Sequence, residues 1–233
     1  EMFTITKIEG IETDRDFGTH SVVLTKGIDY SNLTFDNRKP HTPIKMVYTG
    51  NLLIGRATSL VEISKALGNI NKDEIKVTFD IYTPTVLDAE STKMLNSNGC
   101  IKHAPVPKEQ VAQIQKNADI VVFVESLEKE HRYDARLSFS SKLTDYFASG
   151  KCIFAIGDEI IAPIQYLKEY DCAIVSTDYS QVEEQLRKLI DNPAMIMEYG
   201  RKAFETGYMN HEESKVKKTF VDILCRAANS IKK

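Results

Sequence analysis

Two glycines and an arginine follow the first long apolar run of the sequence, at the start of a predicted helix. The segment YTGNLLIGRATSL runs from Tyr48 to Leu60 and carries Gly50, Gly55 and Arg56 in its turn. Glycines between a strand and a helix leave backbone amides open beside a helix N-terminus, which favours an anion. A fixed cation is poorly placed at a helix start unless an anion joins it. Arg56 therefore favours an anion site over a plain glycine turn.

The two common nucleotide motifs with such glycines are absent. Arg56 and Ala57 stand where a P-loop requires Lys and then Ser or Thr, so the hydroxyl that would bind magnesium is missing. The sequence also has no G-x-G-x-x-G, so a dinucleotide-binding fold has little support. The turn is therefore interpreted as an anion site of another kind.

A lysine and an aspartate lie one helical turn apart in the segment Arg136–Asp158. Ser140 or Ser141 can cap the predicted helix, which places Lys142 in its first turn and Asp145 one turn later. The helix dipole disfavours a cation in the first turn, and a bound phosphate would reverse that sign. An aspartate at this distance is within reach of a ribose diol. The alternative is an i,i+3 surface pair that contributes only about a few tenths of a kcal/mol.

Alternating strands and helices from residue 44 onward position these residues. Six apolar runs rich in Val, Ile or Phe have the length of buried strands: Ile44–Thr49, Ile75–Ile81, Gly99–His103, Asp119–Glu125, Cys152–Ile156 and Cys172–Ser176. Apolar residues at helical spacing lie between them, for example Leu60, Ile63 and Leu67. The pattern predicts an α/β fold with a Rossmann-like, doubly wound parallel sheet of about six strands. Ligands bind such sheets at the carboxyl edge of the strands.

The two ends of the sequence differ from this pattern. After Ser176 only helices are predicted: one that ends at Asn192-Pro193, a second from about Ala194 to Ala203, and a last one after His211. Residues 1–40 contain two short apolar stretches and then a polar segment that is interpreted as a linker. The Rossmann-like domain is therefore expected to comprise residues 41–233.

Composition restricts the class of protein. The 233 residues include 42% hydrophobic and 27% charged residues with a net charge of -3, which indicates a globular protein and no nucleic-acid binding. The sequence has neither the long apolar run of a membrane span nor a signal peptide. The four cysteines have no partners at zinc-ligand spacing, which indicates reduced thiols and a cytoplasmic location. The closing helix has a basic side, so peripheral membrane association is an alternative to packing on the domain.

The segment FSSKLTDYFASGKCIFAIGD (residues 139–158) resembles the donor-binding core of GT-B fold glycosyltransferases, particularly family 4 or group 1. Other parts of the C-terminal domain of these enzymes are similar to VVLTKGID, MVYTGNLLIGR, GCIKHAPVPKEQVAQIQKNADIVVFVES and DNPAMIMEYGRKAFE. The resemblance covers roughly residues 20–230. It implies that residues 41–233 form the nucleotide-sugar-binding, C-terminal half of a GT-B fold, and that residues 1–40 are a remnant of the preceding domain and a linker.

The resemblance also implies a role for each matching residue. Arg56 and Lys142 would bind the diphosphate of a sugar nucleotide and would be catalytic, because they stabilise the charge that develops on the leaving group. Asp145 would bind the ribose hydroxyls. Backbone at His103 and Ala104, after the third strand, would contact the base. Further phosphate contacts would come from Gly50, Gly55, Ser140 and Ser141.

One position departs from the family pattern. Leu137 stands eight residues before Asp145, where the family often has a glutamate, and the neighbouring Arg136 cannot replace a carboxylate. Contacts to the donor sugar and the stereochemical outcome are therefore not implied. The resemblance implies no essential metal, and a nearby group of charged residues is interpreted as solvated loop charge: Glu125, Glu128, Glu130 and His131.

The expected function is donor binding in a glycosyltransferase of polysaccharide biosynthesis. The chain would move a sugar from a nucleoside diphosphate sugar, with UDP or GDP as the nucleotide, to an acceptor such as a glycan or lipid-linked glycan, and would need no cofactor. The expected partner is a missing N-terminal, acceptor-binding domain, without which the chain would be inactive. The alternatives are a GT-B type nucleotide-sugar epimerase or phosphorylase, and a non-catalytic nucleotide-binding module.

Overall fold

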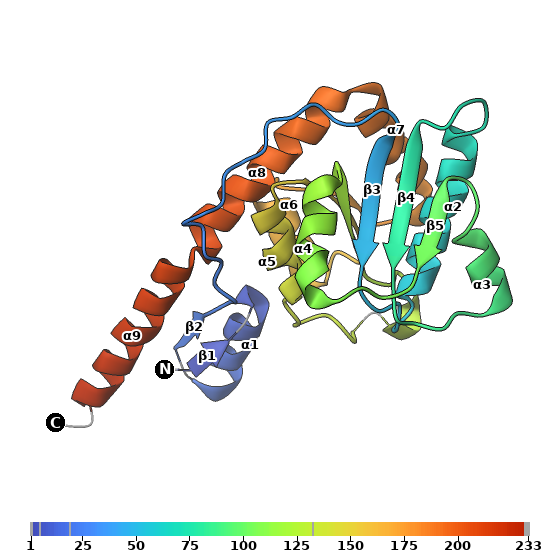
Figure 1. Cartoon of the computed structure of the whole chain (residues 1–233). Helices are drawn as coiled ribbons and strands as arrows, with labels where there is room; N and C mark the ends of the chain where they lie inside the picture. Colours follow the sequence, from blue (N-terminus) through green and yellow to red (C-terminus); the bar gives the residue numbers. More distant parts are fainter. Residues whose placement is uncertain (1, 5, 19, 132, 231–233) are drawn as a thin grey trace.

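The computed structural model describes residues 2–4, 6–18, 20–131 and 133–230. Its centre is a parallel sheet of six strands in the order β5-β4-β3-β6-β7-β8 (Figure 1). These strands are β3 (Ile44–Thr49), β4 (Val77–Tyr82), β5 (Cys100–His103), β6 (Ile120–Val124), β7 (Cys152–Ile156) and β8 (Ile174–Ser176). From β3 the chain adds β4 and β5 on one side, and from β6 it adds β7 and β8 on the other side. The switch point between these two strands is where such sheets bind ligands.

Helices cover both faces of this sheet. One face carries α2 (Arg56–Ile70), α3 (Ala89–Met94) and α7 (Val182–Asp191), and the other carries α4 (Lys108–Asn117), α5 (Ser141–Ser149) and α6 (Ala162–Glu169). A long helix, α8 (Pro193–His211), packs on α5 and β7. The predicted doubly wound parallel sheet is therefore confirmed. The six-residue α3 has no apolar stripe and was not predicted.

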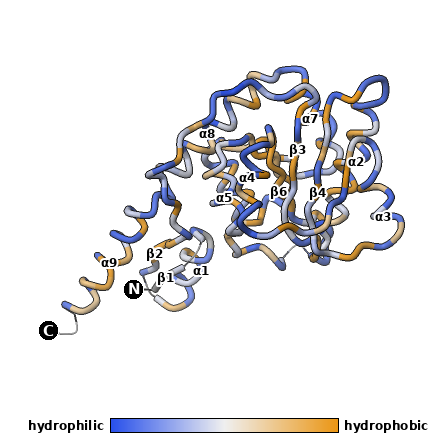
Figure 2. Tube along the Cα trace, in the orientation of Figure 1, coloured by the Kyte–Doolittle hydropathy of each residue, from blue (hydrophilic) through white to orange (hydrophobic). Residues whose placement is uncertain are grey.

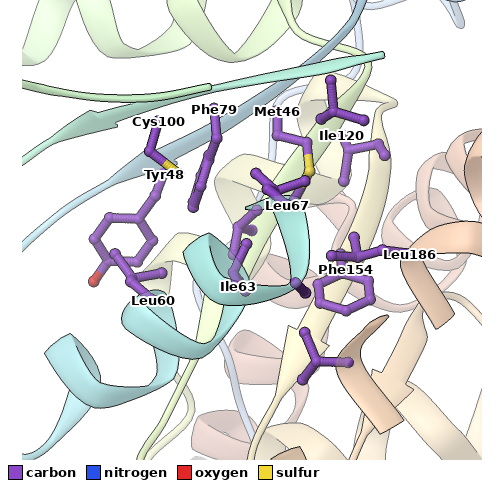
Figure 3. Packing of buried hydrophobic residues seen from close by; sticks show 14 of the residues in the cluster. Met46, Tyr48, Leu60, Ile63, Leu67, Phe79, Cys100, Ile120, Phe154 and Leu186 are labelled. Atoms are coloured by element: carbon purple, nitrogen blue, oxygen red, sulfur yellow. The ribbon is translucent and has the colours of Figure 1, made fainter. Parts of the chain in front are cut away.

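The core consists of apolar side chains from the strands and from one stripe of each covering helix. All residues of β6 and β7 are buried, as expected for central strands that are covered on both faces. Figure 3 shows how Ile63 and Leu67 of α2 lie against Met46, Phe79 and Phe154 of three strands. Each such side chain contributes roughly 1.5–3 kcal/mol when fully buried. This packing fixes the carboxyl ends of the strands in space.

The first residues form a small β-α-β unit where two apolar stretches and a linker were expected. It consists of β1 (Met2–Thr4), α1 (Lys7–Phe17) and β2 (Ser21–Val23), with the two strands parallel and paired. We call this the N-terminal unit. It is attached to the domain by ion pairs of Glu12 with Arg136 and of Lys7 with Glu169. The segment after it, residues 24–43, runs along α8 (Figure 1). The sequence pattern was too short in these strands to predict them.

The C-terminal part contains longer helices than the sequence predicted. α8 continues to His211 instead of ending near Ala203, and α9 (Glu213–Ser230) follows directly. α9 extends away from the sheet beside the N-terminal unit (Figure 1), and its hydropathy changes between apolar and polar along its length (Figure 2). Among the described residues, no helix combines the length and apolar character needed to cross a bilayer. Residues 1 and 231–233 of the two predicted domains lie outside the described residues.

Candidate functional site

A cavity of about 550 Å³ lies at the carboxyl edge of the sheet, between α4 and α5. We call it the edge cavity. Its lining includes Gly50 after β3, Tyr82 and Pro84 at the end of β4, and Lys142 and Asp145 on α5. Pro105 and Val106 after β5 close the side opposite α5. The cavity thus lies where the topology of a doubly wound sheet predicts a ligand.

Lys142 places its ammonium directly over the glycine turn. Its Nζ donates a hydrogen bond to the Tyr48 hydroxyl at 3.1 Å and lies 4.8 Å from the centre of the same ring. A Cβ atom built on Gly50 would lie 2.6 Å from Cε and Nζ of Lys142, so only glycine leaves room for the ammonium there. Gly50 also has a φ of 147°, which other residues rarely adopt. Turn and lysine are therefore fitted to each other.

The pKa of Lys142 falls to about 8, mainly because the ammonium is buried and secondly because the positive Arg56 is near. Glu125 opposes this shift through its negative charge. A bound anion would favour the charged form of the lysine in the same way. Burial and Arg56 thus outweigh the negative charge of Glu125 at this lysine.

The serines before Lys142 form the start of α5. Ser140 is the N-cap, and its hydroxyl accepts a hydrogen bond from the Lys142 amide at 3.4 Å. Ser141 is the first helical residue and is exposed. An N-terminal helix turn carries partial positive charge, which adds to the ammonium of Lys142. The predicted cap is therefore present, with the Ser140 hydroxyl engaged by its own helix.

Arg56 has an anionic partner within the protein. Its guanidinium donates to both carboxylate oxygens of Glu125 at 2.9 and 3.0 Å and to Asn51 Oδ1 at 2.9 Å. The side chain of Glu125 is only 5% exposed. The interpretation of Glu125 as solvated loop charge was therefore wrong, because this residue directly follows β6 and is buried against Arg56. The anion that the sequence required beside Arg56 is present in the chain itself.

Gly55 precedes this arginine and closes the turn. It is the N-cap of α2 with a φ of 66°, and an added Cβ would meet Ser126 and Glu128 at less than 3 Å. Gly55 therefore allows the turn to pack against the segment that follows β6. It does not line the edge cavity among the described residues.

Asp145 points into the edge cavity and is paired with a residue far away in sequence. Its Oδ1 accepts from Lys26 Nζ at 2.7 Å, and this pair is about half exposed. No contact with Lys142 is recorded within the described part of the chain, so the i,i+3 surface pair that the sequence left open is not what the structure shows. Lys26 belongs to the segment that joins the N-terminal unit to the domain. A ligand hydroxyl at Asp145 would share the carboxylate with Lys26 or replace it.

His103 and Ala104 lie at the end of β5, beside the edge cavity. The imidazole of His103 is 2.6 Å from Asp80 Oδ1 and stacks on the ring of Tyr82, with centroids 4.5 Å apart and planes 14° apart. The lining of the cavity comes from the residues just after Ala104 and from Tyr82. The side chain of His103 thus packs on the Tyr82 ring, and Tyr82 in turn lines the cavity.

The charged loop after β6 groups three possible ligand atoms. Those of Glu128, Glu130 and His131 all lie within 4.8 Å of one another. Glu128 accepts a hydrogen bond from Thr58, and Asp134, together with the neighbouring glutamates, raises the pKa of His131. These bonds and ion pairs explain the grouping within the protein.

The sequence did not identify Tyr48, Lys26 or Gln115 as residues of this site. Tyr48 is fully buried and resembles any core residue of a strand, and the buried Gln115 donates to Thr49 from the last turn of α4. Lys26 is distant in sequence. The signal that the sequence offered for Tyr48 was its place two residues before Gly50; its ring packs with α2, and its hydroxyl accepts from Lys142.

Solved structures share this fold. The chain superposes on TarM with a TM-score of 0.71 at 13% identity, over 94% of this chain and 42% of TarM. It superposes on Anabaena HepE in complex with UDP-glucose with a TM-score of 0.68 at 10% identity, over 96% of this chain and 63% of HepE. The C-terminal domain of LpcC, a group 1 glycosyl transferase family protein of Francisella tularensis, gives a TM-score of 0.60 at 12% identity, over 80% of this chain and all of that domain.

These comparisons show the fold of the C-terminal half of a GT-B protein, as the resemblance in the sequence implied. The chain spans less than half the length of TarM. No protein-family model matches the chain, and no curated protein sequence is similar to it.

Proposed function

We propose that the chain is the donor-binding half of a glycosyltransferase that uses a nucleoside diphosphate sugar. The observation that carries this proposal is the ammonium of Lys142, held over Gly50 in a cavity at the carboxyl edge of the sheet. A cation beside a glycine turn and a helix start is suited to a diphosphate. The fold comparisons support the proposal, since one structure of this fold contains UDP-glucose.

Lys142 and Arg56 have different parts in this proposal. Lys142 contacts the diphosphate directly, because within the described residues its ammonium donates to the neutral Tyr48 hydroxyl and to no carboxylate. Arg56 uses three of its five N–H groups on Glu125 and Asn51, which leaves two for a phosphate oxygen. Glu125 then fixes the orientation of the guanidinium, and its negative charge reduces the positive potential that Arg56 offers to a phosphate.

The mechanism is electrostatic stabilisation of the leaving group. As the bond between sugar and phosphate breaks, negative charge accumulates on the diphosphate. Lys142 and the start of α5 border the edge cavity, and Arg56 lies near enough to Lys142 to lower its pKa. With these groups held in place before the reaction, no large reorganisation would be needed when the charge develops. Removing one such donor typically costs about 10²–10³ in rate, which is the scale expected for Lys142.

The rest of the edge cavity is suited to a nucleoside. Tyr82, Pro84 and Val106 provide apolar surface for a base, and backbone near Ala104 provides polar groups beside it. Asp145 is placed to bind the ribose hydroxyls after Lys26 shifts. The acceptor, a glycan or lipid-linked glycan, would bind with the help of a second domain, and the chain alone would not catalyse transfer.

Calorimetric titration with UDP, GDP and ADP tests this function. At least one diphosphate should bind, and Lys142→Ala should weaken it much more than the matching nucleoside. Lys65→Ala is the matched control, because Lys65 lies on the exposed side of α2 and pairs with Glu62. If none of the three nucleotides binds at millimolar concentration, the proposal is wrong. If Lys142→Ala weakens nucleoside and diphosphate equally, the phosphate role of Lys142 is wrong.

A further inference from the structure

A second cavity, of about 670 Å³, lies between the N-terminal unit and the helices α6, α8 and α9. We call it the aromatic cavity, because Phe139, Tyr166 and Tyr170 are part of its lining. Its volume is within the range of small-molecule sites, roughly 300–1,000 Å³. None of the sequence patterns pointed to it, since its lining comes from five separate segments of the chain.

A hydrogen-bonded network fixes the floor of this cavity. The imidazole of His211 is 2% exposed, and its two nitrogens lie 2.6 Å from Thr25 Oγ1 and 2.9 Å from the Tyr166 hydroxyl. Asn210 donates a further hydrogen bond to the same hydroxyl at 2.8 Å. Burial lowers the pKa of His211 to about 4, so the network is uncharged at neutral pH. A satisfied buried network of this kind holds its members in one arrangement.

The aromatic rings form a rigid wall above this floor. Tyr166 meets Phe139 edge to face with centroids 5.2 Å apart, and Tyr170 lies 4.6 Å from Tyr166 at an angle of 37°. Asn210, Gln165 and three threonines also line the cavity and bring amide and hydroxyl groups to it. Such a mixture of flat apolar faces and neutral hydrogen-bonding groups suits a sugar ring, which has C–H faces and hydroxyl edges.

Three charged residues belong to the described lining of the aromatic cavity: Lys7, Glu169 and Lys215. Lys7 forms an exposed ion pair with Glu169 at 2.9 Å. Lys215 is also exposed, donates to the Tyr208 carbonyl and lies over the Tyr208 ring. Of these charges, Lys7 and Glu169 neutralise each other, and Lys215 has a neutral carbonyl and a ring as its partners. The rest of the described lining is uncharged at neutral pH, which suits a neutral ligand.

Two short segments of the chain link the aromatic cavity to the edge cavity. Phe139 lines the aromatic cavity three residues before Lys142, which lines the edge cavity. Thr25 lines the aromatic cavity, and the next residue, Lys26, contacts Asp145 in the edge cavity. The segment that leads into α5 and the segment at residues 25–26 thus connect residues of the two cavities.

We propose that the aromatic cavity binds a neutral, hydroxyl-bearing ring such as a pyranose, and that this ring belongs to the acceptor. The binding of a sugar ring follows from the lining of this cavity alone. Its assignment to the acceptor rests on the proposed function, because only a glycosyltransferase would need a second sugar beside its donor.

Saturation-transfer NMR on the full chain tests this site with three probes. These are the methyl glycosides of glucose, galactose and N-acetylglucosamine, at millimolar concentration. At least one glycoside should receive magnetisation from the protein, and Tyr170→Ala should reduce the effect several-fold. Asn210→Leu should do the same, since it removes a neutral hydrogen-bonding group from the lining. Tyr133→Ala is the control, because Tyr133 is exposed and lies outside the cavity.

Three outcomes would overturn the proposal: no transfer to any glycoside, transfer that neither cavity variant reduces, and transfer to cyclohexanol as strong as to the glycosides. UDP titration of the same samples separates this proposal from the proposed function. Glycoside binding without UDP binding would support the sugar site and contradict the donor function. UDP binding that both cavity variants retain, together with a lost glycoside signal, would support both.

Discussion

The guanidinium of Arg56 and the carboxylate of Glu125 form a bidentate ion pair at the carboxyl edge of the sheet. Only 15% of the arginine side chain and 5% of the glutamate side chain are exposed. The pair joins the first turn of α2 to the end of β6, on the two sides of the switch point of the sheet. Arg56 is therefore a structural cation as well as a candidate phosphate ligand, and variants of it must be interpreted with both roles in mind.

Arg56→Ala should lower the free energy of unfolding by about 3 kcal/mol, because it leaves the carboxylate of Glu125 buried without a partner. Glu125→Ala should cost a similar amount. The double variant should cost less than the sum, since neither charge then remains alone. Urea unfolding measures all three. Arg187→Ala breaks an exposed i,i+4 pair with Glu183 and should cost less than about 1 kcal/mol. Additive costs in the double variant would contradict a coupled pair.

Gly50→Ala should displace the ammonium of Lys142, since the new Cβ would lie 2.6 Å from Cε and Nζ. We expect roughly tenfold weaker UDP binding, the loss of about one charge-assisted hydrogen bond, with the affinity for uridine little changed. Calorimetry measures both affinities. Gly18→Ala is the control for backbone strain alone, because Gly18 has a φ of 62° with open space around it. If Gly18→Ala weakens UDP as much as Gly50→Ala does, the steric argument fails.

Much of the fold could be predicted from the sequence, because parallel strands buried on both faces are continuous apolar runs. The bounds of β3 and β7 agree with the prediction at both ends. The β-α-β unit at the start was not predicted, because strands of three residues carry too little pattern. The end of α8 was predicted too early, near Ala203, because the sequence there has no clear signal for where the helix ends.

Less of the candidate site could be predicted, because its contacts join residues far apart in the chain. The helix cap at Ser140 and the place of Lys142 in the first turn of α5 follow from local spacing, and both are present. The pairing of Asp145 with Lys26 and of Arg56 with Glu125 depends on which segments the sheet brings together. Sequence spacing therefore gave the positions of the charges but not their partners.

The affinity of the chain for UDP should fall as the pH rises through about 8. The pKa of Lys142 is lowered to about 8, so the lysine is protonated below this pH and loses its charge above it. Bound diphosphate favours the protonated form, which moves the decline to somewhat higher pH. Calorimetry between about pH 7 and about pH 9.5 measures the effect, over a range in which the phosphates keep their charge. Lys142→Arg should bind with little dependence on pH, because an arginine stays charged throughout. The same decline in Lys142→Arg would assign it to another group.

The protein should lose stability between about pH 6.5 and about pH 4 through His211, whose pKa is lowered to about 4 by burial. In this range the unfolded chain binds a proton at this histidine and the folded chain does not. Stability is therefore complete above the unfolded pKa and falls as the pH decreases, by up to about 3 kcal/mol. The groups in contact with His211 are Thr25, Tyr166, Phe139 and Phe147, which stay neutral over the whole range.

Urea unfolding of the wild type and of His211→Asn at about pH 7 and about pH 5 measures this contribution. His211→Asn should be less stable at pH 7, because it loses contacts with Thr25 and Tyr166. Its further loss on acidification should be smaller than that of the wild type, since its side chain takes up no proton. Asp36, which accepts from Lys151, and Glu183, which accepts from Asn69 and Arg187, have a lowered pKa in both proteins, so their contributions to acid destabilisation cancel in the difference. An equal loss in the two proteins would show that His211 does not cause the acid destabilisation, because its pKa would then be the same in the folded and the unfolded chain.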